Sequence, residues 1–282
     1  MTASGQAPDP DSASFEARRG ALLEGLASRG RVAVAFSGGV DSSVLLHAAH
    51  AVLGDGALGV IADSPSLPRS ELEEARRVAA DIGARLVEVK TSELSDPRYN
   101  KNDADRCYFC KHALFDAMVE VARREGIEHL AFGKIRDDAL DDRPGERAAT
   151  ELGVLAPLDA AGFSKEDVRR YAREAGIAVA EKPASACLAS RIPRGTEVTA
   201  ERLRTVEAAE ARLRELGLSE LRVRHRGQHA RVELGPREWA AWGRAPQGQE
   251  QLAEELSPFG FRTVELAPYV APGTGSSASA TS

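Results

Sequence analysis

Apolar and polar residues follow two different patterns along this chain, and the change comes near residue 191. Before that point, short apolar runs alternate with stretches in which apolar residues recur every three or four positions. Short runs bounded by glycine or polar residues predict buried strands, and the longer spacing predicts amphipathic helices. Because strands alternate with helices, we expect an α/β domain built on a doubly wound parallel sheet.

The expected elements of this first domain follow one another without an internal repeat. We predict strands at residues 32–36, 57–62, 85–90, 128–132 and 154–158. We predict helices at residues 15–29, 44–53, 72–82, 110–125 and 165–175. The last of these helices follows Ser164 and Asp167, which are spaced as in a capping box, with aspartate in the place of the usual glutamate.

The pattern beyond residue 191 predicts a smaller α+β domain. Residues 199–216 have the spacing of a long amphipathic helix, residues 220–225 and 229–234 alternate as half-exposed strands, and residues 261–266 form a final strand. Terminal segments rich in Ser, Gly, Ala and Pro are expected to be disordered. The predicted divisions are a tail at 1–14, the α/β domain at 15–194, the α+β domain at 195–270 and a tail at 271–282.

Composition narrows the class of protein. Hydrophobic residues make up 43% of the 282 positions, which is ample for a core, and the net charge of −6 argues against a broad nucleic-acid surface. The sequence contains no apolar run of about 18 residues, so we expect no transmembrane helix. The N-terminal stretch lacks the basic region and apolar core of a secretory signal. Three cysteines do not make a disulfide scaffold, so we expect a cytoplasmic protein with reduced thiols.

The stretch Arg31–Ser43, RVAVAFSGGVDSS, joins the first strand to a helix through a glycine turn. Such a turn presents backbone N–H groups at a helix N-terminus, where the partial positive charge favours phosphate. Gly38 and Gly39 let the backbone approach the phosphate oxygens because no Cβ intervenes. Asp41 is suited to hold Mg²⁺, and neighbouring hydroxyl groups add donors. These hydroxyls belong to Ser37, Ser42 and Ser43.

The turn is not the loop of NTPases that cleave a γ-phosphate, because GxxxxGK[ST] is absent from the chain. It resembles the PP-loop of ATP pyrophosphatases, which cleave ATP between the α- and β-phosphates and adenylate a substrate. A tight turn without a ligand is the alternative, and the combined serines, glycines and aspartate favour the ligand. Asp63 and Ser64 end the second strand, where ligands of open α/β sheets bind, so we count them as ATP-binding candidates.

The cysteines fall in two places. Cys107 and Cys110 lie in DRCYFCKH, directly before a predicted helix, and Cys187 lies in KPASACLASR. Three thiolates suit three irons of a [4Fe–4S] cluster and leave the fourth iron open to hydrosulfide. Zinc with a fourth ligand from His112 or His129, or no metal at all, are the alternatives. We expect the three thiols to converge over the nucleotide crevice.

Arginines in the second part of the chain form another candidate site. Arg222 and Arg224 lie two positions apart on a predicted strand and so share one face, as Arg231 and Glu233 do on the next strand. Arg191 precedes them. Convergent arginines suit a phosphate group, and a solvated strand face with paired charges is the alternative.

Taken together, these segments resemble the LarE-type sulfur transferases that mature the nickel-pincer cofactor of lactate racemase. The similar pieces, between about Val32 and Leu266, are AFSGGVDSSVLL, ADSPSLPRSEL, DRCYFCK, DDRPGERAATELGV, FSKEDVRRYAREAGI, KPASACLASRIPRG and the LRVRH to HARVEL hairpin. The resemblance implies that ATP adenylates each carboxylate of a pyridinium biscarboxylate mononucleotide, which then becomes a thiocarboxylate. It also implies homo-oligomers, often hexamers.

The resemblance also implies residue roles. Cys187 matches the sulfur-bearing cysteine, which in single-cysteine members gives up its own sulfur and becomes dehydroalanine. Cys107 and Cys110 match the branch that is thought to bind a [4Fe–4S] cluster and to pass on a cluster-bound sulfide. Gly133 joins the ATP-binding candidates, although the stretch Gly133–Asp138 departs from the superfamily's common pattern and leaves Lys134 and Arg136 without a role. The positions that the resemblance implies for substrate or phosphate binding are Arg143, Arg191, Glu210, Arg222, Arg224 and Glu233.

Three other functions compete. A tRNA thiolase of the PP-loop class needs a basic groove or zinc-binding cysteine pairs, and neither the acidic charge nor the cysteine count supports it. An ammonia-using ligase of the NAD or GMP synthetase kind needs no cysteines. A non-catalytic adenine-nucleotide sensor would bind ATP and release no pyrophosphate.

Overall fold

The computed structural model describes residues 10–140, 144–183, 185–243, 245 and 247–270. By its contacts the chain divides into two units, the first formed by Met1–Tyr99 with Ala104–Ser185 and the second by Asn100–Asp103 with Ala186–Ser282. The contacts thus place residues 186–194 with the second unit, whereas the sequence prediction places them in the first domain. The predicted tail 271–282 and residues 1–9 lie outside the described part, and α1 (Pro10–Ala27) begins inside the predicted tail 1–14.

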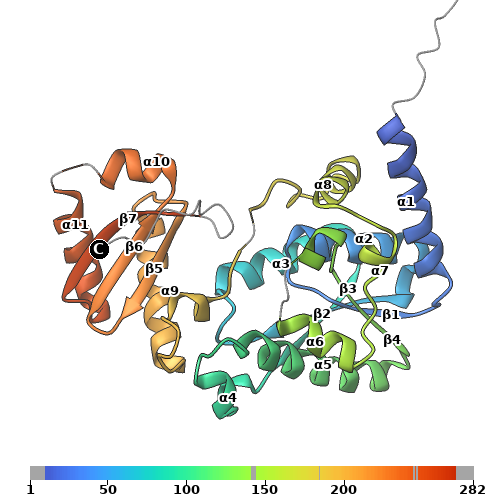
Figure 1. Cartoon of the computed structure of the whole chain (residues 1–282), viewed down its shortest axis with the longest axis horizontal. Helices are drawn as coiled ribbons and strands as arrows, with labels where there is room; N and C mark the ends of the chain where they lie inside the picture. Colours follow the sequence, from blue (N-terminus) through green and yellow to red (C-terminus); the bar gives the residue numbers. More distant parts are fainter. Residues whose placement is uncertain (1–9, 141–143, 184, 244, 246, 271–282) are drawn as a thin grey trace, which may run out of the picture. The chain divides into compact units, whose positions relative to one another are not determined.

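A parallel sheet of four strands, in the order β3-β2-β1-β4, forms the centre of the first unit (Figure 1). The strands are β1 (Val32–Ala35), β2 (Ala57–Asp63), β3 (Arg85–Lys90) and β4 (His129–Phe132). Val32 pairs with Ala57 on one side and His129 on the other. The predicted fifth strand is wrong: its residues add only a single bridge, between Leu155 and Ala131, because the chain then turns into a helix at Pro157.

Helices cover both faces of this sheet, which is the doubly wound arrangement predicted from sequence. After α1, the helices of this unit are α2 (Val40–Leu53), α3 (Arg69–Ile82), α4 (Pro97–Asn100), α5 (Arg106–Glu125), α6 (Pro144–Glu151), α7 (Pro157–Ala160) and α8 (Lys165–Glu174). Val32 and Val34 belong to a core that also contains residues of α1, α2, α3 and α8, whereas Ala33 belongs to a core with residues of α5 and α6. Alternate residues of one strand point to opposite faces, so β1 is buried on both.

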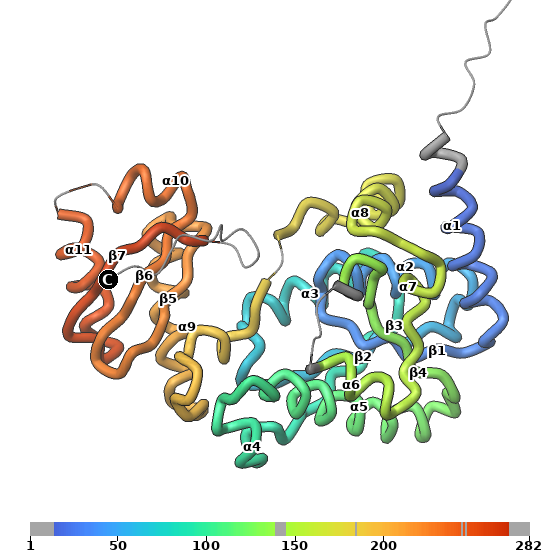
Figure 2. Tube along the Cα trace, in the orientation of Figure 1, coloured from blue at the N-terminus to red at the C-terminus, as the bar shows by residue number. Residues whose placement is uncertain are grey.

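Helix ends follow local chemistry. The capping box predicted at Ser164 is confirmed, because its hydroxyl accepts from the Asp167 N–H and its own N–H donates to Asp167 at 2.8 Å. Gly83 and Gly126 end α3 and α5 in the left-handed conformation, which glycine adopts without strain. One boundary differs from prediction: α5 begins at Arg106 and not near Cys110, so Cys107 lies inside the helix, in its first turn. Figure 2 shows the course of the backbone through these helices as a tube.

The second unit packs helices on a three-stranded sheet of order β5-β6-β7. Strands β5 (Leu221–Arg226) and β6 (His229–Leu234) are antiparallel, and β7 (Thr263–Pro268) runs parallel to β6. Apolar residues of the three strands pack with those of α9 (Ala200–Glu215) and α11 (Gly248–Leu256). Shorter elements are α10 (Pro236–Glu238) and the turn η4 (Leu188–Arg191). Among the described residues of the chain, no helix is long and apolar enough to cross a membrane.

Candidate functional site

The glycine turn between β1 and α2 is held in one shape by its own residues. Gly38 has φ of 71°, and a Cβ there would lie 2.8 Å from the Ala75 Cβ, so only glycine fits. The Ser42 hydroxyl donates to the Gly39 carbonyl at 3.0 Å and lies 3.1 Å from the Ser37 hydroxyl. These contacts tie the turn to the first residues of α2, which is the arrangement that a phosphate cradle needs.

The end of β4 lies against this turn. A Cβ on Gly133 would come within 2.9 Å of the Ser42 backbone nitrogen, so glycine is required where the chain leaves β4. The glycine turn and the C-terminal end of β4 both line a cavity of about 200 Å³. Its lining includes the turn residues Ser37, Gly39, Asp41 and Ser42, with Gly133, Lys111 and Phe132 beside them.

Asp41 has a cationic partner that sequence reasoning missed. Lys165, the first residue of α8, places its ammonium 2.7 and 2.8 Å from the two carboxylate oxygens of Asp41. The Lys165 backbone N–H donates to Asp137 at 2.7 Å, which ties α8 to the segment after β4. A signal was available in the sequence, since a lysine in the first turn of a helix opposes the helix dipole and calls for a nearby anion.

Three of the predicted ATP-binding residues have other surroundings. Ser43 is fully buried, and its hydroxyl has no hydrogen-bond partner among the described residues. Asp63 forms an ion pair with Arg69, and the Ser64 hydroxyl donates to Glu93. None of the three belongs to the lining of the 200 Å³ cavity in the described part of the chain. The structure thus gathers the glycine turn, Asp41, Ser42 and Gly133 at that cavity.

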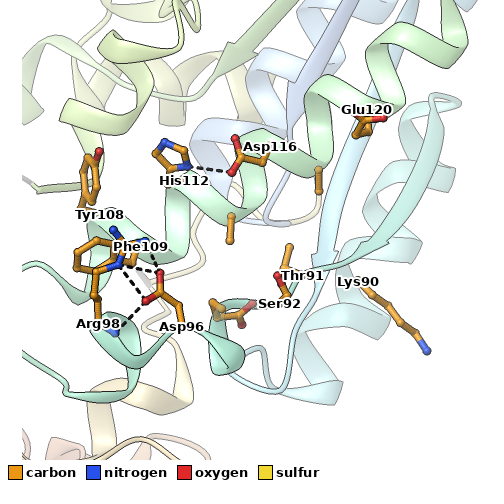
Figure 3. Close-up of a pocket in the computed structure, with 13 residues that line it drawn as sticks. Lys90, Thr91, Ser92, Asp96, Arg98, Tyr108, Phe109, His112, Asp116 and Glu120 are labelled. Carbon is orange, nitrogen blue, oxygen red and sulfur yellow. Dashed lines mark hydrogen bonds and ion pairs between the residues drawn. The ribbon is translucent and has the colours of Figure 1, made fainter.

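A second, larger cavity of about 550 Å³ lies in the same unit, beside the first turns of α5 (Figure 3). Tyr108 and Phe109, which separate the two cysteines of α5, line it. Cys107 is exposed and Cys110 is half-buried. Residues three apart on a helix are neighbours, so these thiols suit two ligands of one metal centre. Within the described residues, no three His, Cys, Asp or Glu side chains form a group that would hold a metal ion.

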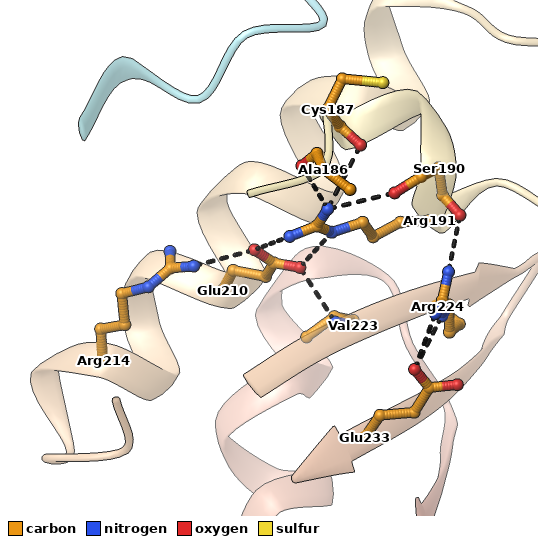
Figure 4. A network of polar contacts seen from close by, with 9 residues as sticks. All are labelled: Ala186, Cys187, Ser190, Arg191, Glu210, Arg214, Val223, Arg224 and Glu233. Carbon is orange, nitrogen blue, oxygen red and sulfur yellow. Dashed lines mark hydrogen bonds and ion pairs between the residues drawn. The ribbon is translucent and has the colours of Figure 1, made fainter. Parts of the chain in front are cut away.

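Cys187 lies in the second unit, where a buried ion pair holds its backbone (Figure 4). The Arg191 side chain donates to the carbonyls of Ala186 at 2.6 Å and Cys187 at 3.2 Å. Its Nε donates to Glu210 at 2.8 Å, and Glu210 is fully buried. Glu210 also accepts from the Val223 N–H at 3.1 Å, which fixes the segment to β5. Arg191 therefore positions the cysteine backbone.

The other predicted arginines gather on β5. Arg224 donates to the Ser190 carbonyl at 2.7 Å and to Glu233 at 2.8 and 3.0 Å. Arg222 lies with its guanidinium 4.2 Å from the centre of the Tyr269 ring. Burial lowers the pKa of Arg222, and the nearby cations Arg191 and Arg224 lower it further.

The structure therefore brings Arg191, Glu210, Arg222, Arg224 and Glu233 together around the Cys187 segment. Arg143 lies outside the described residues. Arg214, which also donates to Glu210 at 3.0 Å, was not singled out from the sequence. Its position one helical turn after Glu210 was the available signal.

Known proteins resemble this chain over much of its length. No family model matches the chain. An uncharacterized protein of Synechocystis is 40% identical over 236 residues, 84% of this chain and 88% of the relative. The pyridinium-3,5-bisthiocarboxylic acid mononucleotide synthase of Lactiplantibacillus plantarum is 34% identical over 255 residues, 90% of this chain and 91% of the relative. A component of the glutamine-hydrolyzing GMP synthase of Archaeoglobus fulgidus is 28% identical over 159 residues, 52% of this chain and 52% of the relative.

Proposed function

Since the chain belongs to the LarE-type ATP-dependent sulfur transferases of the PP-loop superfamily, we propose that it makes pyridinium-3,5-bisthiocarboxylic acid mononucleotide from the corresponding biscarboxylate. This product is the organic part of the nickel-pincer cofactor. The similarity to the Lactiplantibacillus enzyme over 90% of the chain is the observation that carries the proposal.

The first step is adenylation. A carboxylate is a poor electrophile because oxide would have to leave, so a carboxylate oxygen attacks the α-phosphorus of ATP and pyrophosphate leaves. Backbone N–H groups of the glycine turn and the hydroxyls of Ser37 and Ser42 support binding of the phosphates at the 200 Å³ cavity. Asp41 would hold Mg²⁺, which neutralises the leaving pyrophosphate when it is bound.

The second step is sulfur transfer, with the sulfur supplied either by Cys187 or by a cluster that Cys187 helps to hold. Sulfur attacks the acyl carbon of the adenylate, and AMP leaves with the former carboxylate oxygen. Arg191 holds the Cys187 carbonyl and so positions the cysteine, and Arg222 and Arg224 supply positive charge for the substrate phosphate.

We propose Cys107, Cys110 and Cys187 as ligands of a [4Fe–4S] cluster, which would supply hydrosulfide as a renewable sulfur source. The placement of the first two on one helical turn supports two of these ligands. The other source is Cys187 itself. Its thiolate would displace AMP to form a thioester, and loss of the Cα proton would then break the Cβ–Sγ bond, which leaves the thiocarboxylate and a dehydroalanine after one turnover. Iron and sulfide counts on anaerobically purified protein, together with the mass of the protein after turnover, separate the two sources.

We also propose that the protein acts as a homo-oligomer in the cytoplasm on its small nucleotide-like substrate. Light scattering on the purified chain tests the assembly.

Pyrophosphate release with a panel of acceptors tests the substrate. The protein receives Mg²⁺ and ATP with pyridinium-3,5-biscarboxylate mononucleotide, with bulk tRNA, or with an ammonium salt. We expect release with the pyridinium compound alone. Release that depends on tRNA or ammonium would replace this proposal by a tRNA thiolase or an ammonia-using ligase.

A further inference from the structure

Four residues of the chain ahead of α5 pack with the second unit. Asn100–Asp103 belong to that unit by their contacts, although Tyr99 and Ala104 on either side belong to the first. Asn102 is fully buried, and its φ of 59° makes it the one residue other than glycine with a positive φ in the described part of the chain. Asparagine tolerates this left-handed conformation better than most residues. A backbone held in such a conformation by its surroundings is typical of functional sites.

The side chain of Asn102 holds one loop of the second unit. Its amide nitrogen donates to the carbonyls of Pro193 at 2.8 Å, Thr196 at 2.9 Å and Ile192 at 3.3 Å. The Gly195 N–H donates in return to the Asn102 carbonyl at 3.3 Å. Carbonyl oxygens accept hydrogen bonds and cannot donate them, so the contacts depend on the N–H groups of the amide. Asn102 is therefore a buried clamp on this loop.

The clamped loop continues the turn that begins at Cys187. In η4, Cys187 is the N-cap residue and Ile192 is the C-cap residue. The Ser190 N–H donates to the Cys187 carbonyl at 2.9 Å, and the Ile192 N–H donates to the Ala189 carbonyl at 3.2 Å. Hydrogen bonds thus run along the whole turn, from the residue that Asn102 holds to the cysteine.

Two arginines hold the same turn at other points (Figure 4). Arg191 donates to the Cys187 carbonyl at 3.2 Å, and Arg224 on β5 donates to the Ser190 carbonyl at 2.7 Å. Asn102 adds the contact at the C-terminal end. Because both ends and the middle of η4 are held by side chains, the backbone at Cys187 has little freedom to move.

We infer that Asn102 is a positioning residue for Cys187. Its amide N–H groups are turned to the three carbonyls, so it acts by holding η4 and not by contact with the substrate. The inference rests on the proposed function and adds a residue to it. It applies to either sulfur source, because Cys187 must be in place both to give up its sulfur and to hold a cluster. Small displacements of a reacting group slow a reaction steeply.

Asn102→Gly tests this role. Glycine keeps the left-handed backbone without strain and removes the amide donors. In a single turnover, we expect the rate constant of thiocarboxylate formation to fall at least about tenfold and that of pyrophosphate release to stay within about twofold of wild type. Leu252→Ala is the control, because it opens a void in a core of the second unit that contains no residue of η4. It should leave both rate constants unchanged.

A second readout needs no substrate. Residue-resolved hydrogen exchange on the nucleotide-free chain compares the N–H groups of Ser190 and Ile192 with those of β6 in the same unit. Asn102→Gly should speed exchange in η4 by at least about tenfold relative to β6, since a loosened turn opens locally. Leu252→Ala should change the two groups together. If wild type forms no thiocarboxylate, the proposed function fails, and exchange still tests the clamp.

Arg194→Met provides the test if Asn102→Gly does not fold. The Arg194 side chain donates to the Asp103 carbonyl, so its loss removes a milder contact between the same two segments. It should speed exchange in η4 and slow sulfur transfer by a smaller factor than Asn102→Gly. Unchanged exchange in η4, an equal slowing of transfer in Leu252→Ala, or an equal slowing of pyrophosphate release and transfer would overturn the inference.

Discussion

Lys165 and Asp41 are 124 positions apart in the chain, yet the lysine ammonium contacts both carboxylate oxygens of the aspartate, at 2.7 and 2.8 Å. The pair joins the first turn of α8 to the first turn of α2, beside the glycine turn. Mg²⁺ bound to Asp41 would need the same oxygens. The ammonium and the metal ion therefore compete for one carboxylate.

This competition predicts the behaviour of Lys165→Met. Removal of the ammonium frees Asp41, so Mg²⁺ or Mn²⁺ should bind the nucleotide-free protein up to about fivefold more tightly, as expected from the loss of a partly exposed contact of about 1 kcal/mol or less. Both side chains are partly exposed, so stability should fall by less than about 1 kcal/mol. Mn²⁺ titration followed by electron paramagnetic resonance measures the affinity. An unchanged metal affinity would show that the two cations do not compete.

Asp41→Asn tests adenylation. The amide keeps the shape of the side chain but loses the charge that would hold Mg²⁺, so we expect pyrophosphate release to disappear while the fold persists. Asp55→Asn, at an exposed position in the turn after α2, is the control and should release pyrophosphate at the wild-type rate. Wild-type release by Asp41→Asn would remove Asp41 from the proposed site.

Cys187→Ser separates the two chemical steps. A hydroxyl is a far weaker nucleophile than a thiolate, so this variant should adenylate the substrate and release pyrophosphate but form no thiocarboxylate. Mass spectrometry of the small-molecule products measures the outcome. Continued thiocarboxylate formation by the serine variant contradicts the assignment of Cys187 as the sulfur-bearing residue.

The buried pair of Arg191 and Glu210 makes a prediction about stability. Arg191→Met leaves the fully buried Glu210 with one partly exposed cation, Arg214, so the second unit should lose about 3–5 kcal/mol of unfolding free energy. Both tryptophans, Trp239 and Trp242, lie in this unit, so denaturant unfolding followed by their fluorescence reports on it.

The matched control for that measurement is Arg212→Met. Arg212 pairs with Glu255 at 2.8 Å near the surface, and exposed pairs contribute about 1 kcal/mol or less. Equal losses in the two variants would mean that the Arg191 pair is not a buried determinant of the fold.

Acid should weaken the second unit through Glu238. The Ser219 hydroxyl donates to this carboxylate at 2.6 Å, and with the N–H groups of Ser219 and Glu220 it lowers the pKa of Glu238 from 4.5 to about 2. A lowered pKa stabilises the fold above the unfolded value of 4.5, and that contribution is lost as the pH falls toward 2. Tryptophan-monitored unfolding between pH 6 and pH 2 follows it, and Glu238→Gln should show a shallower dependence. The same slope in wild type and variant would contradict this origin.

The strands of the first unit could be predicted because buried parallel strands are short apolar runs between turns, as at Val32–Ala35. The glycine turn was visible because its residue types are tied to one geometry. The first turn of α5 was missed because Cys107, Tyr108 and Cys110 carry no helical apolar spacing, although Asp105 before them is a common N-cap residue. The contact of Lys165 with Asp41 was missed because α8 is distant in sequence, and only folding brings it to the turn.

The most direct measurement of the central claim is the ratio of pyrophosphate released to thiocarboxylate formed in one reaction. The protein, purified without oxygen, is incubated with ATP, Mg²⁺ and pyridinium-3,5-biscarboxylate mononucleotide. We predict one pyrophosphate and one AMP for each thiocarboxylate group, because each carboxylate must be adenylated before sulfur attacks it. Formation of thiocarboxylate with release of ADP and phosphate instead, or with no nucleotide cleavage, would contradict the account.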